Sequence, residues 1–184
     1  MSPRLTPDAA RDESGNMVQR RKIVTRTRSF PSALLLKVHE SMRHEEPSII
    51  KPIMKSEFFL RLPSEDAGPD DAATGQDLLD TLHEHEHECV GLAANMIGVR
   101  KRIICVKDGN RALLMYNPQI LEQVNAYQTS EGCLSLVGER PCTRYRRIKV
   151  EYLDENFARR IKNFSGYTAE IIQHEIDHCQ GIVI

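Results

Sequence analysis

The stretch Ala169–Gly181, which reads AEIIQHEIDHCQG, decides how the rest of the sequence is interpreted. Its apolar residues recur at the spacing of one helix face, and a glycine follows them, as at the C-terminal end of many helices. The stretch therefore predicts a buried helix that ends near Gly181. The residues of the predicted buried face are Ala169, Ile172, Ile176 and Cys179.

Two histidines lie on this predicted helix, four residues apart. His174 and His178 would be stacked on one face, where both can reach one ion, and Glu175 would lie at the edge of that face. Such an HExxH pattern also arises by chance on polar helix faces. Moreover, a catalytic site of this kind usually has three protein ligands and one open position. Because only six residues follow His178 (184 minus 178), we expect the third ligand upstream.

A cysteine upstream is the candidate third ligand. Cys133 lies in the segment Glu131–Ser135, which reads EGCLS, after a glycine and at the end of a predicted strand. There the N–H of Leu134 would be free to point toward a bound substrate. A lone cysteine is more often an inert small core residue.

The segment Glu131–Ser135 followed by Gln173–His178 resembles the peptide deformylase family, which joins an EGCLS segment to a QHExDH helix. A third segment, Cys89–Met96, resembles the family pattern GxGxAAxQ less closely. Cys89 stands in place of the first glycine of that pattern, and Met96 in place of its glutamine. The resemblance covers roughly residues 53–184.

The resemblance implies an α+β fold in which antiparallel strands pack around a C-terminal, metal-binding HExxH helix. It also implies a hydrolase that removes the formyl group from the N-terminal formyl-methionine of newly made peptides and releases formate, acting transiently beside the ribosome. Ferrous iron is the metal that the family implies. Zinc is our second choice, because a thiolate with two imidazoles suits zinc on ligand preference alone.

The same resemblance assigns roles to individual residues. Glu175 would act as general base, and the backbone N–H of Leu134 would stabilise the oxyanion. The Met side chain needs a hydrophobic pocket, with Ile97, Leu134 and Ile171 as candidate walls. Apart from the resemblance, Glu131 is either a solvated acid or a partner that holds a ligand or a nearby arginine, with Arg140 and Arg144 as candidates. The metal ligands would be Cys133, His174 and His178, and the substrate-binding residues Gly91, Gly132 and Leu134.

The two departures from the family pattern affect different properties. Met96 has no N–H and cannot donate to an oxyanion as a glutamine amide would. Asn95 carries an amide next to it, so we consider Asn95 as a substitute donor. Cys89 would restrict the backbone if that position requires a positive φ.

Two alternative functions follow from these departures. The chain could be a weakened or inactive homologue that binds formylated peptides, or a hydrolase of another N-acyl amide. Glu175 argues against a binding protein, which has no need of a carboxylate beside a metal-activated water.

The remaining sequence predicts one catalytic domain at residues 53–184, preceded by a disordered tail at 1–30 and, at 31–52, a short helix, Ala33–Met42, and an extended link. Residues 65–74 read as a loop and Gln76–Glu88 as a helix. The turn Asp108–Asn110 separates the first two predicted strands. The predicted strands are 102–107, 112–116, 120–129, 148–153 and 159–164.

Composition excludes several classes of protein. A formal net charge of -1 gives no reason to expect bulk attraction to nucleic acid or membrane, and no run of apolar residues is long enough to span a bilayer. We therefore expect a cytoplasmic protein without sequence-specific nucleic-acid binding. The five cysteines have no paired spacing, which favours reduced thiols. His83 and His87 could share an ion on the helix 76–88, although a solvated helix end is the favoured interpretation.

Overall fold

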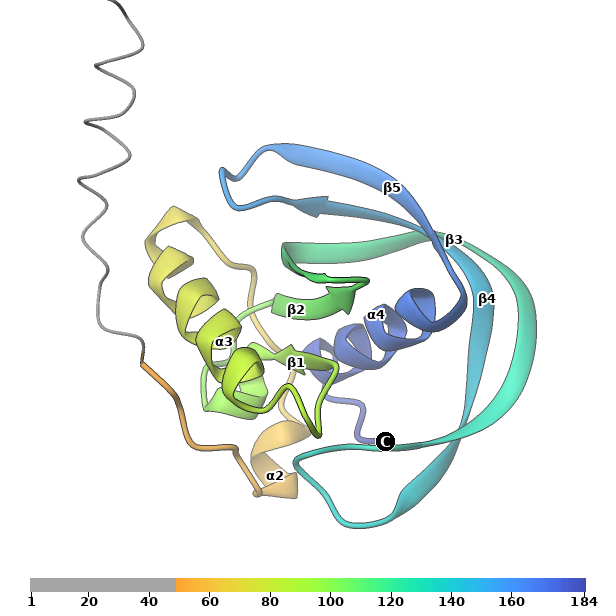
Figure 1. Ribbon diagram of the computed structural model, residues 1–184, viewed down its shortest axis with the longest axis horizontal. Coiled ribbons are helices and arrows are strands. Elements are labelled where there is room, and N and C mark those ends of the chain that lie inside the picture. The colour runs from red at the N-terminus through yellow and green to blue at the C-terminus, as the bar shows by residue number, and fades with distance from the viewer. Residues whose placement is uncertain (1–48) are drawn as a thin grey trace, which may run out of the picture. The chain divides into compact units, whose positions relative to one another are not determined.

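The computed structural model describes residues 49–184 of the chain (Figure 1). The tail at 1–30, the helix Ala33–Met42 and most of the link predicted for 31–52 lie outside the described residues. The helical elements are α2 (Glu57–Leu60), η1 (Pro69–Asp71), α3 (Ala72–Glu84), η2 (Ala94–Ile97) and α4 (Gly166–Cys179). The strands are β1 (Gly91–Ala93), β2 (Ile103–Asp108), β3 (Arg111–Gly132), β4 (Glu139–Leu153) and β5 (Arg159–Ser165).

The five strands form one antiparallel sheet in the order β1-β2-β3-β4-β5. Each strand therefore pairs with its neighbour in the sequence, which is the simplest way to build such a sheet. The sheet curves around α4, and α3 covers the end formed by β1 and β2 (Figure 1). This arrangement confirms the predicted α+β class with antiparallel strands around the C-terminal helix.

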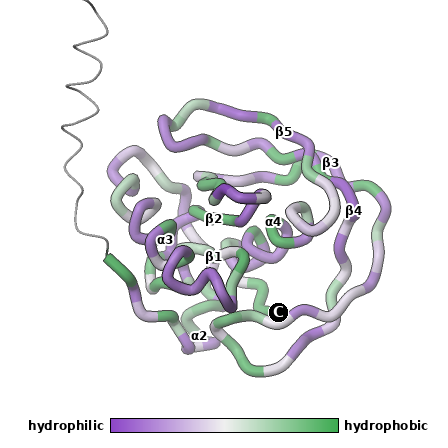
Figure 2. Tube along the Cα trace, in the orientation of Figure 1, coloured by the Kyte–Doolittle hydropathy of each residue, from purple (hydrophilic) through white to green (hydrophobic). Residues whose placement is uncertain are grey.

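Helix α4 is the centre of the core. The four residues of its predicted apolar face are all at most 3% exposed, and Gly181 has the positive φ of +76° expected just after a helix end. Apolar residues are concentrated in the middle of the molecule, whereas the turn after α3 and the outer strands are largely hydrophilic (Figure 2). The buried face that the sequence predicted therefore anchors α4 beneath the sheet.

The structure corrects the predicted strands between residues 112 and 153. The runs 112–116 and 120–129 belong to one continuous strand, β3, which contains register shifts where the sequence suggested a break. One shift is at Asn117, which has a positive φ of +51° and whose side-chain amide bonds both the N–H and the carbonyl of Ala67. Strand β4 begins at Glu139, nine residues before the predicted start at Ile148 (148 minus 139).

Four short elements, α2, η1, β1 and η2, were not predicted, and one helix is displaced. A three-residue strand such as β1 is too short to show an alternating pattern, and the single turn of α2 is too short to show a helical one. Helix α3 begins at Ala72, inside the predicted loop 65–74, and ends at Glu84 rather than Glu88. The predicted turn at 108–110 is confirmed, with Gly109 at a φ of +65°.

Among residues 49–184, no helix combines the length and the apolar character that crossing a membrane requires.

Candidate metal centre

The candidate ligands converge from two parts of the fold. Cys133 directly follows β3 at the start of the turn into β4, and His174 and His178 project from one face of α4. His178 Nε2 lies 3.2 Å from Cys133 Sγ and 3.2 Å from His174 Nε2. The three potential ligand atoms all lie within 4.8 Å of one another. The predicted third ligand is therefore next to the two histidines.

The donor set fits a divalent transition metal. One sulfur and two imidazole nitrogens face a common point, and this combination suits zinc or ferrous iron better than calcium or magnesium. Burial, assisted by the positive charges of His174 and Arg144, lowers the pKa of His178 to about 3. His178 is thus neutral at physiological pH, which is the form that binds a metal.

A buried ion-pair network orients His174. Glu131 Oε2 lies 2.8 Å from His174 Nδ1, and Arg144 donates to both carboxylate oxygens of Glu131 at 2.8 and 2.9 Å. Arg144 also donates to Asp177 at 2.6 Å. Burial opposes ionisation of Glu131, but the hydrogen bonds from His174 and Arg144 outweigh it and lower its pKa to about 2. Of the two arginines proposed as partners of Glu131, Arg144 makes this contact.

The proposed general base lies beside the ligands in an apolar environment. Glu175 is 3% exposed, its Oε2 has no hydrogen-bond partner among the described residues, and burial raises its pKa to about 7. Gly91 in β1 makes room for it. A Cβ added at Gly91 would lie 2.6 Å from Glu175 Oε1 and 2.6 Å from Ile171. A larger residue at this position would therefore displace the carboxylate.

A cavity of about 270 Å³ opens in front of Glu175 and two of the candidate ligands, Cys133 and His174. Leu134 and Ile171 line it, as predicted for the hydrophobic walls, but Ile97 does not, and Met96 lies there instead. Neighbouring residues of a 3-10 helix face different directions, which explains the exchange between Met96 and Ile97. Gly91 and Gly132 also line the cavity, although an added Cβ at Gly132 would meet nothing closer than 3.7 Å.

The turn after Cys133 leaves Leu134 at the cavity. The N–H of Ser135 points to Cys133 Sγ at 3.4 Å, and the N–H of Leu136 donates to the Cys133 carbonyl at 3.1 Å. The Leu134 carbonyl accepts a bond from Lys55 Nζ at 2.6 Å. These contacts fix the turn on both sides of Leu134.

The structure contradicts the two ideas about Asn95 and Cys89. The Asn95 amide donates to the backbone carbonyl of His178 at 2.7 Å, and Asn95 does not line the cavity, so it does not replace a glutamine there. Cys89 has no positive φ, and its thiol donates to the Gly91 carbonyl at 2.8 Å. The substitution at Cys89 therefore causes no backbone strain.

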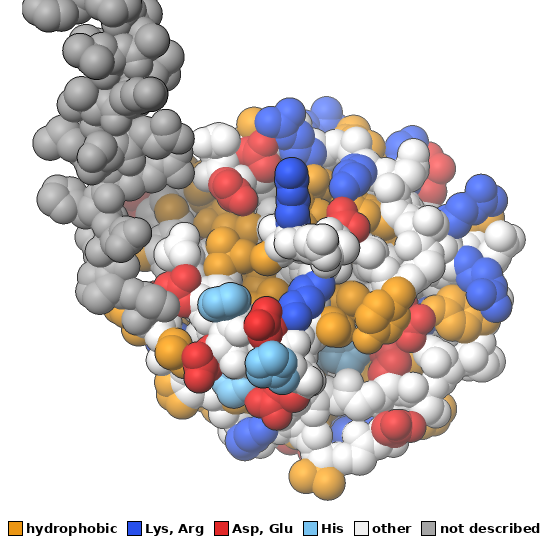
Figure 3. Space-filling view, in the orientation of Figure 1, with side chains coloured by type: hydrophobic (Ala, Val, Ile, Leu, Met, Phe, Trp, Pro, Cys, Tyr) orange, Lys and Arg blue, Asp and Glu red, His pale blue; other side chains and the backbone are white. Residues whose placement is uncertain are grey.

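The histidines at the C-terminal end of α3 and in the following turn do not form a second candidate site. Because α3 ends at Glu84, His87 lies in the following turn and is not stacked on His83. Within residues 49–184 the only group with metal-ligating geometry is Cys133 with His174 and His178. On the face seen in Figure 3, exposed histidines are flanked by acidic side chains, as expected of a solvated helix end.

A polar pair at the edge of the cavity was not predicted from the sequence. Tyr127 in β3 donates its hydroxyl to Glu170 of α4 at 2.5 Å, and Glu170 lines the cavity one helical turn before His174. The helical spacing of Glu170 and His174 was the available signal.

Comparisons with known proteins agree with this geometry. Residues 52–184 match the family described as polypeptide deformylase. The chain is 51% identical over 136 residues to a peptide deformylase of Clostridium beijerinckii, covering 74% of this chain and 100% of that protein. It is also 38% identical over 111 residues to peptide deformylase 1 of Clostridium perfringens, covering 59% of this chain and 74% of the relative.

Solved structures give the same result. A class I type b peptide deformylase from Acinetobacter baumannii, solved with Met-Ala-Ser bound, superposes with a TM-score of 0.67 at 29% identity, covering 74% of this chain and 97% of that one. The peptide deformylase of Thermus thermophilus superposes with a TM-score of 0.65 at 33% identity, covering 73% of this chain and 83% of that one. The sequence motifs, the fold and these matches together place the chain in the peptide deformylase family.

Proposed function

We propose that the chain is a metal-dependent hydrolase that removes the formyl group from N-terminal formyl-methionine. Water and the formyl amide give formate and a free amine, so that a C–O bond forms and the C–N bond breaks. The observation that carries the proposal is the buried carboxylate of Glu175 beside a convergent thiol and two imidazoles, in a chain of this family. A metal held by Cys133, His174 and His178 would supply Lewis acidity.

Glu175 moves the proton in this proposal. It takes a proton from the attacking water and later delivers it to the departing amine, the double role of a base in amide hydrolysis. A pKa of about 7, caused by burial, suits both directions of transfer near neutral pH. The missing Cβ of Gly91 keeps the carboxylate in this position.

The oxyanion that develops on the formyl oxygen needs hydrogen-bond donors. We assign the backbone N–H of Leu134 to this role, because the turn fixes Leu134 at the cavity. Met96 lines the same cavity but has no N–H to donate. Loss of one such donor costs about 100- to 1000-fold in rate, so we expect slow but measurable turnover.

The substrate would lie between β1 and the end of β3. Gly91 of β1 and Gly132 of β3 flank the cavity there. The absence of side chains there allows a peptide backbone to approach closely. The apolar side chains of Met96, Leu134 and Ile171 would receive the methionine of the substrate. Such substrates arise on new chains, so we propose action beside the ribosome in the cytoplasm, with ferrous iron as first metal and zinc as second.

Formate release from formyl-Met-Ala-Ser tests the proposal. The protein is purified anaerobically and loaded with ferrous iron, and its metal content is measured before the assay. We expect release to fall about 100- to 10,000-fold in Glu175→Gln without loss of metal. Glu84→Gln, at the end of α3, is the control and keeps full activity. No release from wild type with one metal ion bound would contradict the proposed function.

A further inference from the structure

The two candidate histidine ligands are held in different ways. The ring of His174 is fixed at its far nitrogen, because Nδ1 lies 2.8 Å from Glu131 Oε2. His178 is 1% exposed, and its Nδ1 has no hydrogen-bond partner among the described residues. A ligating histidine usually donates its second ring N–H to an acceptor that sets the direction of the ring. The direction of the His178 ring therefore depends on its packing and on its backbone.

The backbone of His178 lies in the last turn of α4, where helix carbonyls have no partner further along the helix. Its carbonyl accepts the Gly181 N–H at 3.1 Å, which is a local bond, and the side-chain amide of Asn95 at 2.7 Å. The bond from Asn95 is the shorter of the two and joins residues 83 positions apart in the sequence. It therefore ties this ligand to a distant part of the fold.

The segment that carries Asn95 is itself fixed by backbone hydrogen bonds. The Gly98 N–H donates to the Asn95 carbonyl at 3.1 Å, and the Met54 N–H donates to the carbonyl of Met96, the next residue of η2, at 2.7 Å. Asn95 is 0% exposed. The amide thus extends from a rigid base and has little freedom to move away from α4.

Stability alone does not account for a buried amide at this position. The Oδ1 of Asn95 has no partner among the described residues, and an unpaired amide oxygen in the core costs free energy. The amide cannot be turned over to relieve this, because Oδ1 would then face the carbonyl oxygen of His178. What the amide adds to the fold is the placement of His178.

We propose that Asn95 is a positioning residue of the metal centre, which holds the last turn of α4 by the His178 carbonyl and so directs the His178 imidazole toward the other ligands. The inference rests on the proposed function, because it takes this site to bind a metal ion. His174 is then oriented through its ring and His178 through its backbone. His178 Nε2 lies 3.2 Å from Cys133 Sγ and 3.2 Å from His174 Nε2, so a small rotation of the helix end would separate it from both.

The dissociation constant for Zn²⁺, measured on the full chain by competition with a chromophoric chelator, tests the proposal. Asn95→Ala removes the donor, and Asn95→Leu removes it while keeping a branched side chain that fills the space. We expect both variants to bind Zn²⁺ about tenfold more weakly than wild type, as when other partners of metal ligands are lost. The melting temperature of the metal-free protein is measured in parallel.

A matched control removes a similar amide contact away from the candidate ligands. Asn117 in β3 donates its side-chain amide to the Ala67 carbonyl at 2.9 Å and accepts the Ala67 N–H at 2.7 Å. Asn117→Asp deletes the donor and keeps the acceptor, and Asp tolerates the positive φ of this position. It should leave the dissociation constant for Zn²⁺ unchanged, even where the melting temperature falls.

A spectrum separates positioning from a general loosening of the fold. Co²⁺ takes the place of Zn²⁺, and its visible absorption depends on the type and geometry of its ligands. At saturating Co²⁺ we expect the visible bands of Asn95→Ala to shift or weaken, whereas Asn117→Asp should reproduce the wild-type spectrum. A purely structural role of Asn95 would lower the melting temperature and leave the Co²⁺ spectrum of the folded protein as in wild type.

The outcomes keep this inference apart from the proposed function. Wild-type affinity for Zn²⁺, or a wild-type Co²⁺ spectrum, in both Asn95 variants would overturn the inference, as would an equal loss of affinity in Asn117→Asp. If the wild-type chain binds no Zn²⁺, the proposed metal centre fails and the inference fails with it. Formate release is not measured in these experiments, so they decide the role of Asn95 whether or not the chain removes formyl groups.

Discussion

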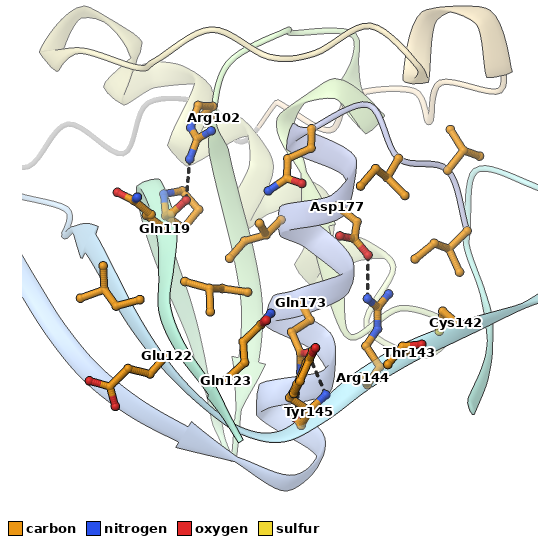
Figure 4. Close-up of a pocket in the computed structure, with 18 of the residues that line it drawn as sticks. Arg102, Gln119, Glu122, Gln123, Cys142, Thr143, Arg144, Tyr145, Gln173 and Asp177 are labelled. Atoms are coloured by element: carbon orange, nitrogen blue, oxygen red, sulfur yellow. Dashed lines mark hydrogen bonds and ion pairs between the residues drawn. The ribbon is translucent and has the colours of Figure 1, made fainter. Parts of the chain in front are cut away.

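Two faces of α4 carry polar side chains but arrange them differently. On one face, His174, His178 and the proposed base Glu175 lie around a common point near Cys133. On the other face, Gln173 bonds the backbone of Tyr145 and Asp177 bonds Arg144, as Figure 4 shows. The polar groups of the second face are therefore satisfied by the β3–β4 hairpin.

The second face also borders the larger cavity. The space between α4 and the hairpin is about 1140 Å³, against about 270 Å³ for the candidate active site. A choice by volume alone would therefore take the larger cavity for the candidate active site. Three convergent potential ligand atoms, and a buried carboxylate oxygen without a partner among the described residues, distinguish the candidate site.

The largest expected effect comes from removing the proposed thiolate ligand. Cys133→Ala should weaken metal binding by well over about 100-fold, because outer partners of metal ligands already contribute 10- to 100-fold. Cys142→Ala changes another partly buried cysteine, which lines the larger cavity, and should keep one metal ion per chain. Elemental analysis after dialysis measures the metal content of both variants. If Cys133→Ala still bound one metal ion per chain, Cys133 would not be a required ligand, and the contrast between the two faces of α4 would fail.

Met96→Gln tests the missing oxyanion donor. An amide at this position of the cavity should raise kcat for formate release by about 100-fold, with a smaller change in KM. Met96→Leu, which has a similar volume and no N–H, serves as the control and should not raise kcat. An unchanged kcat in Met96→Gln would show that the other donors are sufficient.

Glu131→Gln tests the network that joins the two faces of α4. Loss of the carboxylate leaves the buried Arg144 with Asp177 as its remaining partner and no longer orients His174 through a charge. We expect metal affinity to fall about 10- to 100-fold. Competition with a chelator measures the affinity, and an unchanged value would mean that α4 alone positions the histidine.

The smallest effect is expected in the larger cavity. Thr143→Ala removes an exposed side chain that bonds Gln128 across the hairpin. Activity should stay within about twofold of wild type, and the free energy of unfolding within about 0.5 kcal/mol. A larger loss of activity would show that the second face also takes part in function.

Much of the candidate site could be predicted because its signals are local. The four-residue spacing of His174 and His178 specifies one helix face without reference to the rest of the chain. The role of Gly132 and Cys133 needed the family resemblance, since nothing in the spacing joins Cys133 to a histidine 41 residues later (174 minus 133).

The rest depended on tertiary contacts. In the outer parts of β3 and β4 the burial alternates, but most of the less exposed positions carry polar side chains, such as Glu131, Arg140 and Arg144. The sequence therefore lacks the apolar alternation that marks a half-buried strand. The contact of Tyr127 with Glu170 joins residues far apart in the sequence. Whether Met96 or Ile97 faces the cavity depended on η2, a short helix that the sequence did not predict.

The position of Cys133 at the tip of a long hairpin affects how the protein folds. The thiol meets His174 and His178 only after the hairpin has closed over the last helix, and forming such a distant contact has an entropic cost. An ion that binds only this arrangement stabilises the native state by about 4 kcal/mol at a thousand times its dissociation constant. Metal supply would then determine how much of the newly made chain remains folded.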